Sequence, residues 1–493
     1  MRHILFTHPY FLGLDSKQAE AGLPYPPLGT LYAASLMREK GYTVSLFDAM
    51  FARNASEMLP ELEAKRQDYF VVYADGFNYL TKMCLTNMRD ETLRMIQIAR
   101  DWGCTVIVSS SDSTDHTELY LERGADYVIN GEAEQTLVEL LETLEAGGDV
   151  RSVRGIAFME EAGAGGPAAA GSLVLTAPRP VMKDWEYLPY PAYDLVDMDR
   201  YRHYWMKNAG YFSLNVATTR GCPFHCNWCA KPIYGNRYTA RSAEHVVRQL
   251  ARMKREYDFD HVWFCDDIFG LKPGWVKAFA DAVEREGLSF RFKIQSRADL
   301  LLSEDQIRDL ARAGCDNVWM GAESGSQKIL DAMDKGTTIE QIGHATRLLK
   351  EHGVKPSFFI QFGYLGETQE DIALTVGMIR RLLPYEIGIS VSYPLPGTGF
   401  YEKVKTTLGD KANWTDSDDL AMMFAGAYPA AFYRQLYRYV HRVHRQSVAR
   451  HYLSELGRKP LRVSMSRLKK MASILYYLPA ARLAKLKLQH LDH

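Results

Sequence analysis

The chain has 493 residues, of which 47% are hydrophobic and 24% are charged, and its formal net charge is −1. This balance is typical of a globular protein with a large core, and the length suggests about three domains. It excludes a disordered chain, a collagen-like repeat and a coiled coil as the main architecture, and the small net charge excludes a general polyanion binder.

The N-terminal residues read as a short strand and not as a signal peptide, and no apolar run approaches the ~18 residues that cross a bilayer. The seven cysteines are an odd number and too few for a disulfide framework. We therefore expect a cytoplasmic protein in which clustered cysteines bind metal or carry out redox chemistry.

Residues 1–150 alternate short β-rich runs with helical stretches, a pattern typical of βαβ units around a parallel sheet. The predicted strands are Ile4–Phe6, Val44–Phe47, Phe70–Tyr73, Val106–Val108 and Tyr127–Ile129. The predicted helices include Leu28–Lys40, Met88–Trp102 and Glu134–Glu145. The sequence thus predicts an α/β, doubly wound, Rossmann-like domain, whose ligand is expected at the carboxyl ends of the strands.

Residues 151–210 are predicted to form a hairpin and a Pro-rich linker, with a Gly- and Ala-rich loop at Glu160–Ser172 between the hairpin strands. Over residues 211–400 the alternation resumes and predicts a partial or complete (β/α)6 parallel barrel. Its predicted strands lie near Leu214–Thr218, Val262–Phe264, Phe290–Ile294, Asn317–Met320, Ser357–Phe362 and Glu386–Ser392. Residues 401–493 show a helical pattern only.

Three of the cysteines, Cys222, Cys226 and Cys229, stand directly after the first predicted barrel strand, in the segment TRGCPFHCNWC. Barrel active sites are built by loops at this end of the strands. Three thiolates can hold three irons of a [4Fe–4S] cube and leave the fourth iron open for a small ligand. The alternative is a structural zinc site completed by His225 or another residue, although no second cysteine pair lies nearby.

This cysteine spacing, with Trp228 before the last cysteine, resembles the radical S-adenosylmethionine (SAM) superfamily. The resemblance implies that the amino and carboxylate groups of SAM chelate the open iron. One electron, from a donor such as flavodoxin or ferredoxin, then cleaves SAM to methionine and a 5′-deoxyadenosyl radical that abstracts hydrogen from a substrate.

The segments that end the later barrel strands also resemble this superfamily: FCDDIF, QSR, GAESG and FGYLGE. By this resemblance, the residues expected to contact SAM are Asp266, Asp267, Arg297, Glu323, Gly363 and Glu367. Each has a structural alternative, since Glu323 can cap a helix and the glycine pairs can form ordinary turns.

A doubly wound domain before such a barrel resembles the cobalamin-binding members of the superfamily, on the segments YPPLGTL, FDA and GADYVINGEAE. The resemblance implies cobalamin contacts at Leu28, Gly29, Ser110, Asp112, Gly131 and Glu132. The alternative is a domain kept for packing or for another cofactor.

The chain lacks the Asp-x-His-x-x-Gly motif that supplies a histidine to cobalt in many cobalamin domains. The nearest histidine, His116, follows Asp115, which we expect to be the N-cap of a helix. We therefore predict a lower cobalt face without a histidine ligand, covered by the loop at 109–112.

Taken together, the resemblance implies a cobalamin-dependent radical SAM enzyme. We favour a C-methyltransferase that acts on an unactivated carbon through the 5′-deoxyadenosyl radical and methylcobalamin. The alternative is an oxidative cyclase or rearrangement enzyme that resembles the anaerobic magnesium-protoporphyrin ester cyclase, without net methyl transfer. A non-catalytic cobalamin sensor is disfavoured, because a sensor needs no open iron. The expected substrate is a small molecule, either lipid-like, a tetrapyrrole or a natural-product intermediate.

Two features remain outside this assignment. Cys84, Cys104, Cys265 and Cys315 lie in mostly apolar contexts and are predicted to pack as inert small hydrophobes. Residues 431–493 hold 14 Lys and Arg against 2 Asp and Glu. This excess fits a solvated helical face, and its functional alternative is peripheral docking on an anionic membrane surface. Nucleic acid is not expected, because no recognised binding module accompanies the charge.

Overall fold

The computed structural model of the protein describes residues 2–77, 85–160, 172–231, 233–409, 411, 413–458 and 465–491. The chain forms two compact units. The first consists of Met1–Phe224, Lys231–Phe292 and Asn413–Asp419, and the second of His225–Ala230, Lys293–Ala412 and Leu420–His493. The limits of the units therefore run through the cysteine-bearing loop and through the predicted barrel.

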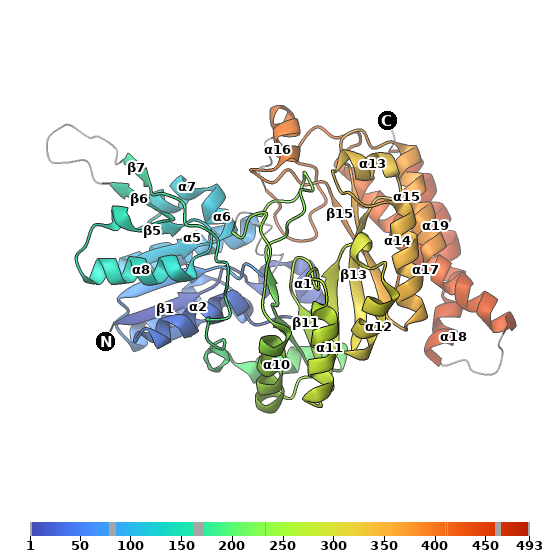
Figure 1. Cartoon of the computed structure of the whole chain (residues 1–493). Coiled ribbons are helices and arrows are strands. Elements are labelled where there is room, and N and C mark those ends of the chain that lie inside the picture. The colour runs from blue at the N-terminus through green and yellow to red at the C-terminus, as the bar shows by residue number, and fades with distance from the viewer. Residues whose placement is uncertain are drawn as a thin grey trace. The chain divides into compact units, whose positions relative to one another are not determined.

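The first unit holds a seven-stranded sheet in the order β2-β1-β3-β4-β5-β6-β7 (Figure 1). The strands are β1 (His3–Thr7), β2 (Thr43–Phe47), β3 (Tyr69–Tyr73), β4 (Thr105–Ser109), β5 (Tyr127–Ile129), β6 (Ile156–Glu160) and β7 (Ser172–Leu175). Strands β1 to β5 pair in parallel, and β6 and β7 extend the sheet as an antiparallel hairpin. All five strands of the doubly wound domain and its hairpin are thus confirmed.

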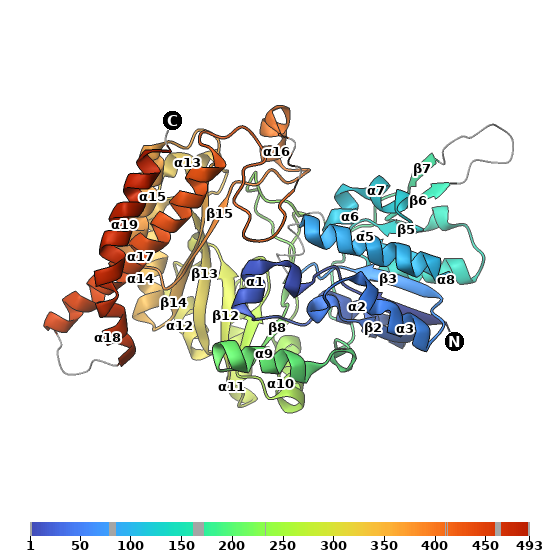
Figure 2. The same cartoon turned by 180° about the vertical axis from the view of Figure 1, so that it is seen from behind.

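Helices cover both faces of this sheet, which explains why β1 and β3 are buried at every position. The two opposite views show α2 (Leu28–Glu39) and α8 (Glu134–Glu145) on one face, and α3 (Leu59–Ala64) and α5 (Thr86–Asp101) on the other (Figures 1 and 2). In the strand order 2-1-3-4-5 the direction in which successive strands are added to the sheet reverses between β1 and β3, and ligands bind at such switch points.

The segment predicted as a linker contains a helix that the sequence analysis missed, α9 (Met198–Ala209). The side chain of Asp197 caps it by accepting a hydrogen bond from Arg200 N, and Gly210 ends it in the left-handed conformation with φ 75°. Both are ordinary helix boundary signals. The preceding Pro-rich run concealed them.

The predicted barrel is present as a six-stranded sheet in the order β15-β14-β13-β12-β11-β8, with two open edges, and is therefore a partial barrel. Its strands are β8 (Ser213–Val216), β11 (His261–Phe264), β12 (Arg291–Ser296), β13 (Cys315–Glu323), β14 (Lys355–Phe362) and β15 (Ile387–Val391). The pairs β8–β11, β13–β14 and β14–β15 are parallel. All six predicted strands are found.

The barrel helices begin at capping residues that are visible in the sequence. Ser242 caps α10 (Ala243–Tyr257), and capping boxes open α14 (Ile339–Glu351) at Thr338 and α15 (Gln369–Leu382) at Thr368. The remaining barrel helices are α11 (Trp275–Arg285), α12 (Glu304–Arg312) and α13 (Gln327–Ala332).

The C-terminal region is only partly helical, contrary to the prediction. Its helices are α16 (Gly399–Val404), α17 (Ala430–Arg458), α18 (Met465–Ala472) and α19 (Ile474–Gln489), and the described residues within 408–429 form no helix. There, Asn413, Asp416 and Asp419 accept hydrogen bonds from nearby backbone N–H groups. Such local bonds compete with the helical ladder.

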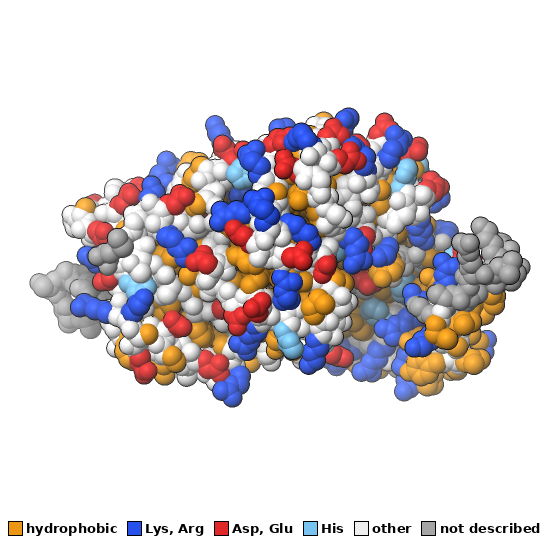
Figure 3. All heavy atoms as spheres, turned by 90° about the horizontal axis from the view of Figure 1, so that it is seen from below, with side chains coloured by type: hydrophobic (Ala, Val, Ile, Leu, Met, Phe, Trp, Pro, Cys, Tyr) orange, Lys and Arg blue, Asp and Glu red, His pale blue; other side chains and the backbone are white. Residues whose placement is uncertain are grey.

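The last two helices expose several large apolar side chains. Met465 and Leu468 on α18, and Leu475, Leu483 and Leu486 on α19, are 44–81% exposed. Figure 3 shows apolar side chains beside lysines and arginines at the end of the molecule that carries α18. Among the helices in the described part of the chain, none is long and apolar enough to cross a membrane.

Candidate active site

The three cysteines lie in a loop that leaves the short strand β9 (Thr219–Arg220), which pairs with β10 (Thr239–Ala240). Gly221 begins the loop with φ +73°, and a Cβ there would lie 2.1 Å from the carbonyl oxygen of Arg237. Only glycine therefore fits at this position. Cys222 is 9% exposed, and Cys226 and Cys229 are half-buried.

The three cysteines are divided between the two units. Cys222 belongs to the first unit, whereas Cys226 and Cys229 belong to the second. Nowhere in the described ranges do three His, Cys, Asp or Glu side chains gather as a metal-binding group. His225, the candidate fourth ligand of the zinc alternative, is exposed.

The surroundings of the loop nevertheless fit an iron–sulfur cluster. Arg297 donates a hydrogen bond from Nη1 to the sulfur of Cys226 over 3.6 Å. The indole nitrogen of Trp228, which lies between the last two cysteines in sequence, is buried with no hydrogen-bond partner among the described residues. Since buried polar groups are rarely left unsatisfied, this N–H and the adjacent cation match an anionic group held by the loop.

Asp266, at the end of β11, positions the strand that leads into the loop. Its Oδ1 accepts hydrogen bonds from the backbone N–H groups of Thr218 (2.7 Å) and Thr219 (2.9 Å), and it also binds the hydroxyl of Thr218. Burial raises the pKa of Asp266 to about 7. Both of its oxygens are thus engaged within the protein, while its neighbour Asp267 is half-buried.

Arg220, two residues before Cys222, is fully buried and pairs with two glutamates. Its guanidinium lies 3.2 Å from Glu132 and 2.5 Å from Glu134 and packs over the ring of Trp185 at 4.6 Å. The other carboxylate oxygen of Glu132 accepts a hydrogen bond from Met182 N. The loop start is therefore fastened to the segment after β5. The side chain of Glu132, predicted to contact cobalamin, is committed to this network.

A second buried ion pair lies at the end of β13. Lys335 Nζ is 2.8 Å from Glu323 Oε1, and both side chains are at most 7% exposed. Burial alone lowers the pKa of Lys335, but the charges of Glu323 and the Cys226 thiol outweigh it and raise the pKa. A Cβ at Gly321 would lie 2.6 Å from atoms of both partners, so the pair requires glycine there.

Arg297 links this ion pair to the cysteine loop. In addition to its bond to Cys226, its Nη2 donates to the carbonyl of Lys335 over 2.7 Å, and Asp299 orients its guanidinium. Two cations, Arg297 and Lys335, thus stand beside one thiol. Glu323 holds a left-handed backbone conformation with φ 54°, which is strained for a residue other than glycine.

Gly363 and Glu367 lie together after β14. The carboxylate of Glu367 accepts a hydrogen bond from Gly363 N over 2.6 Å, and burial raises its pKa to about 8. Its second oxygen, Oε1, and the hydroxyl of the nearby Tyr433 on α17 are buried without a partner in the described part of the chain. These unsatisfied groups mark a place for a polar ligand.

The residues predicted to bind cobalamin share the carboxyl edge of the first unit's sheet, after β1, β4 and β5. At the start of α2, the backbone N–H groups of Leu28 and Gly29 donate to the carboxylate of Asp75 at 3.2 and 3.1 Å. A Cβ at Gly29 would lie 3.2 Å from this carboxylate, which explains the glycine. Gly131 holds φ +88° after β5.

The loop after β4 differs from the prediction in one detail. Ser110 caps α6 (Ser111–Asp115) in a capping box with Ser113, and His116 is the N-cap of α7 (Thr117–Glu122). Asp115 is therefore not an N-cap. Asp115 is instead the last residue of α6, which begins after its N-cap Ser110. Burial raises the pKa of Asp115 to about 6.

The carboxylate of Asp112 is already engaged. It forms two hydrogen bonds with the guanidinium of Arg89, at 2.7 and 2.5 Å, and accepts one from the hydroxyl of Tyr120 at 2.7 Å. His116 Nε2 lies 3.7 Å from the same carboxylate. Asp112 therefore stabilises this loop through contacts within the protein.

Of the other cysteines, Cys104, Cys265 and Cys315 are buried and not disulfide-bonded. Burial raises the pKa of Cys104 to about 11 and raises that of Cys315 further, which keeps both as inert thiols. Cys84 and residues 161–171 of the predicted Gly- and Ala-rich loop lie outside the described residues.

Sequence reasoning missed Arg220, Lys335, Asp75 and Arg89. Each acts through a partner that is 12 to 88 positions away, so no local spacing indicates it. Only Gly29 and Gly321 could have indicated these residues, because a side chain at position 29 would crowd Asp75 and one at position 321 would crowd the pair of Glu323 and Lys335.

Comparisons with known proteins agree with this geometry. Residues 216–379 match the radical SAM superfamily. A Pyrococcus horikoshii protein named as an uncharacterized methyltransferase is 27% identical over 77% of this chain and 79% of its own. The anaerobic magnesium-protoporphyrin IX monomethyl ester cyclase of Rubrivivax gelatinosus is 25% identical over 84% of this chain and 71% of its own.

A solved structure shows the same fold over nearly the whole chain. The cobalamin-dependent SAM radical enzyme OxsB, with aqua-cobalamin bound, superposes with a TM-score of 0.73 and 16% identity, and the match covers 98% of this chain and 72% of OxsB.

The protein therefore contains a radical SAM domain over residues 216–379 and is a radical SAM enzyme. Its fold, a Rossmann-like domain followed by a partial parallel barrel, is the fold of OxsB.

Proposed function

We propose that the protein is a cobalamin-dependent radical SAM methyltransferase that transfers a methyl group to an unactivated carbon of a small molecule. The observation that carries this proposal is the attachment of Arg220, two residues before Cys222, to Glu132 and Glu134 after β5. The start of the loop proposed to hold the cluster is thereby fastened, within the first unit, to the sheet edge proposed to hold cobalamin. Methyl transfer that uses both cofactors needs such a fixed arrangement.

In this proposal, Cys222, Cys226 and Cys229 hold a [4Fe–4S] cluster. When bound, the cluster, SAM and cobalamin supply the radical and the methyl carrier. Arg297 and Lys335 stabilise the negative charge around Cys226. Asp266 holds the start of the loop in place. Asp267, Glu323 and the segment Gly363–Glu367 remain the candidates for SAM contacts.

For cobalamin, we propose that contacts come from Leu28, Gly29, Ser110 and the backbone at Gly131 and Glu132, because the carboxylates of Glu132 and Asp112 are engaged elsewhere. If cobalamin binds at this edge, we expect no histidine of this chain to ligate its cobalt, because the chain lacks the Asp-x-His-x-x-Gly motif. Substitution His116→Ala should leave the electron paramagnetic resonance spectrum of cob(II)alamin unchanged, without nitrogen splitting in either protein. Nitrogen splitting that disappears in the variant would contradict this assignment.

The decisive experiment uses SAM with a labelled methyl group and the candidate substrate. A methyltransferase consumes SAM in two chemistries, so S-adenosylhomocysteine and 5′-deoxyadenosine should accumulate in comparable amounts and the label should appear in the product. Substitution Cys226→Ala should abolish 5′-deoxyadenosine formation. The matched control Cys104→Ala, at a buried thiol remote in sequence from the loop, should leave it unchanged.

The similarity to a magnesium-protoporphyrin ester cyclase favours one alternative, an oxidative cyclase or rearrangement enzyme. Such an enzyme gives 5′-deoxyadenosine with little S-adenosylhomocysteine and an unlabelled product. This result would reverse the order of the two proposals.

A lipid-like or tetrapyrrole substrate would suit an enzyme that contacts a membrane surface. The exposed apolar side chains of α18 and α19, interspersed with lysines and arginines, support such a peripheral contact. Sedimentation with anionic vesicles at low salt and release at high salt would be the expected behaviour. Sedimentation that is equal for the full chain and for a chain lacking residues 458–493 would argue against it.

A further inference from the structure

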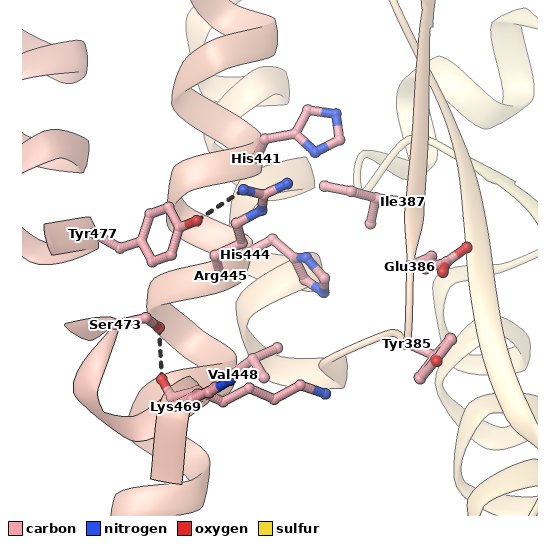
Figure 4. A pocket seen from close by; sticks show the side chains of 11 residues that line it. Tyr385, Glu386, Ile387, His441, His444, Arg445, Val448, Lys469, Ser473 and Tyr477 are labelled. Atoms are coloured by element: carbon pink, nitrogen blue, oxygen red, sulfur yellow. Dashed lines mark hydrogen bonds between the residues drawn. The ribbon is translucent and has the colours of Figure 1, made fainter. Parts of the chain in front are cut away.

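A pocket of about 570 Å³ lies among the C-terminal helices and the first residues of β15, entirely within the second unit (Figure 4). Its walls come from α17, α18, α19 and the segment Tyr385–Ile387. Small-molecule sites in proteins commonly enclose 300–1,000 Å³, so the pocket has room for an organic ligand.

The pocket lies away from the residues assigned to SAM. Ile387, which lines the pocket, is the first residue of β15 (Ile387–Val391). Active sites of parallel barrels lie at the carboxyl ends of the strands, which for β15 is Val391. At a rise of about 3.3 Å per residue, these two ends are about 13 Å apart. The pocket is therefore separate from the strand ends at which SAM is proposed to bind.

Three permanent cations line the pocket: Arg445 on α17, and Lys469 and Lys470 on α18. None of the three forms an ion pair with a described carboxylate, and the lining holds one acid, Glu386. The surplus of positive charge within one concavity is costly unless an anion balances it. This surplus distinguishes the pocket from an ordinary solvated surface with mixed charges.

Neighbouring groups position Arg445 and the adjacent His444. Arg445 Nη1 donates to the hydroxyl of Tyr477 over 2.8 Å, and His444 Nε2 donates to the carbonyl of Pro384 over 2.8 Å. Figure 4 shows Arg445 and His444 on α17 between Tyr477 of α19 on one side and Ile387 on the other. Ile387 and Val448 supply apolar wall next to these polar groups.

We propose that this pocket binds a phosphate or diphosphate group carried by an organic molecule, either a soluble metabolite or a lipid headgroup. The arginine fork bonds phosphate oxygens in pairs, and two lysines supply the point charges that a doubly charged anion requires. The apolar wall accommodates the organic part. The volume exceeds what bare phosphate fills. The proposal does not depend on the chemistry proposed for the active site.

The test is calorimetric titration of the intact, anaerobically reconstituted protein with inorganic pyrophosphate, against sodium chloride of equal ionic strength. We expect saturable binding to the wild type that weakens about tenfold or more in Arg445→Gln, since one charge-assisted hydrogen bond has that magnitude. Lys469→Gln, an exposed position, should weaken binding as well and serves where the first variant folds poorly. Arg450→Gln, an exposed arginine of α17 outside the pocket, is the matched control and should bind as the wild type does.

A second arm distinguishes the two sources of phosphate. Vesicles of phosphatidylcholine with one part in five of phosphatidic acid are compared with vesicles of phosphatidylcholine alone. Pyrophosphate binding that is lost in the pocket variants supports a soluble ligand. Phosphatidate-dependent sedimentation that is lost in the same variants, without pyrophosphate binding, supports a lipid headgroup. Binding that is absent in both arms, or equal in the wild type and the pocket variants, overturns the proposal.

Discussion

The guanidinium of Arg220 lies 2.5 Å from the carboxylate of Glu134, and the two side chains are 0% and 2% exposed. The residues stand 86 positions apart, one before the cysteine loop and the other at the start of α8. With Glu132 they form a buried triad of one cation and two anions. Such a triad is stable only when complete, because each unpaired buried charge carries a large desolvation cost.

Removal of the cation should therefore destabilise the protein strongly. We expect Arg220→Met to lower the free energy of unfolding by about 3–5 kcal/mol, since Glu132 and Glu134 remain buried without the cation that balances their charge. Urea denaturation measures this loss, and addition of Glu132→Gln and Glu134→Gln should recover part of it. The control is Arg53→Met, which breaks the pair of Arg53 (89% exposed) with Glu57 and should change stability by about 1 kcal/mol or less. Equal effects of the two substitutions would contradict the assignment.

Substitution of Arg297 should shift the reduction potential of the proposed cluster. A cation 3.6 Å from a ligand sulfur favours the more negative, reduced state, so Arg297→Gln should make the potential more negative by about 60 mV. Arg297→Lys keeps the positive charge, so its potential should stay close to that of the wild type. This comparison separates the effect of charge from the effect of packing. Redox titration followed by electron paramagnetic resonance measures the potential. An unchanged potential in Arg297→Gln would exclude this role.

The titration of Glu367 should make the protein less stable as the pH rises. Its folded-state pKa is raised from 4.5 to about 8 by burial, so the folded state keeps a proton that the unfolded state releases. The stability contribution is therefore fully present below pH 4.5 and is lost as the pH rises toward 8. Glu367→Gln should remove this loss and be more stable than the wild type at pH 8 by a few kcal/mol. Glu370→Gln, at an exposed position in the first turn of α15, should leave the pH profile unchanged.

The ion pair of Lys335 and Glu323 should be sensitive to one added methyl group. A Cβ at position 321 would lie 2.6 Å from Glu323 Oε1 and from Lys335 Nζ, so Gly321→Ala must displace the pair. We expect a loss of about 1–3 kcal/mol by thermal or urea denaturation. Gly377→Ala lies inside α15 with nothing within 4 Å of the added carbon, and should stabilise by about 0.5–1 kcal/mol. A neutral Gly321→Ala would show that the pair adjusts freely.

Apolar periodicity and capping signals were sufficient for the architecture. The strands of both sheets and helices such as α10 follow from local patterns, because one buried face and one capping residue specify each element. The failures occurred where local signals conflict. The segment Asn413–Asp419 is rich in side chains that bind their own backbone, and α9 follows directly after a Pro-rich run.

The candidate site was predictable only in part. The spacing of Cys222, Cys226 and Cys229 identifies the superfamily, because three thiols at this spacing are rare outside metal chemistry. The commitment of Glu132 and Asp112 to Arg220 and Arg89 was not predictable, since long-range ion pairs leave no periodic trace. Sequence resemblance therefore marks segments that the structure places at the ends of the strands, but it does not distinguish which of their side chains are already engaged within the protein.

The carboxylate of Asp75, held against the first N–H groups of α2, has a consequence for ligand selection. The positive end of a helix dipole at the first turn of a Rossmann-like domain is where dinucleotide enzymes seat a pyrophosphate. Here that position is taken by the carboxyl group of Asp75, which accepts hydrogen bonds from the backbone N–H groups of Leu28, Gly29 and Phe77. A nucleotide phosphate would find these donors already engaged. The domain is thereby closed to nicotinamide and flavin dinucleotides in their customary pose.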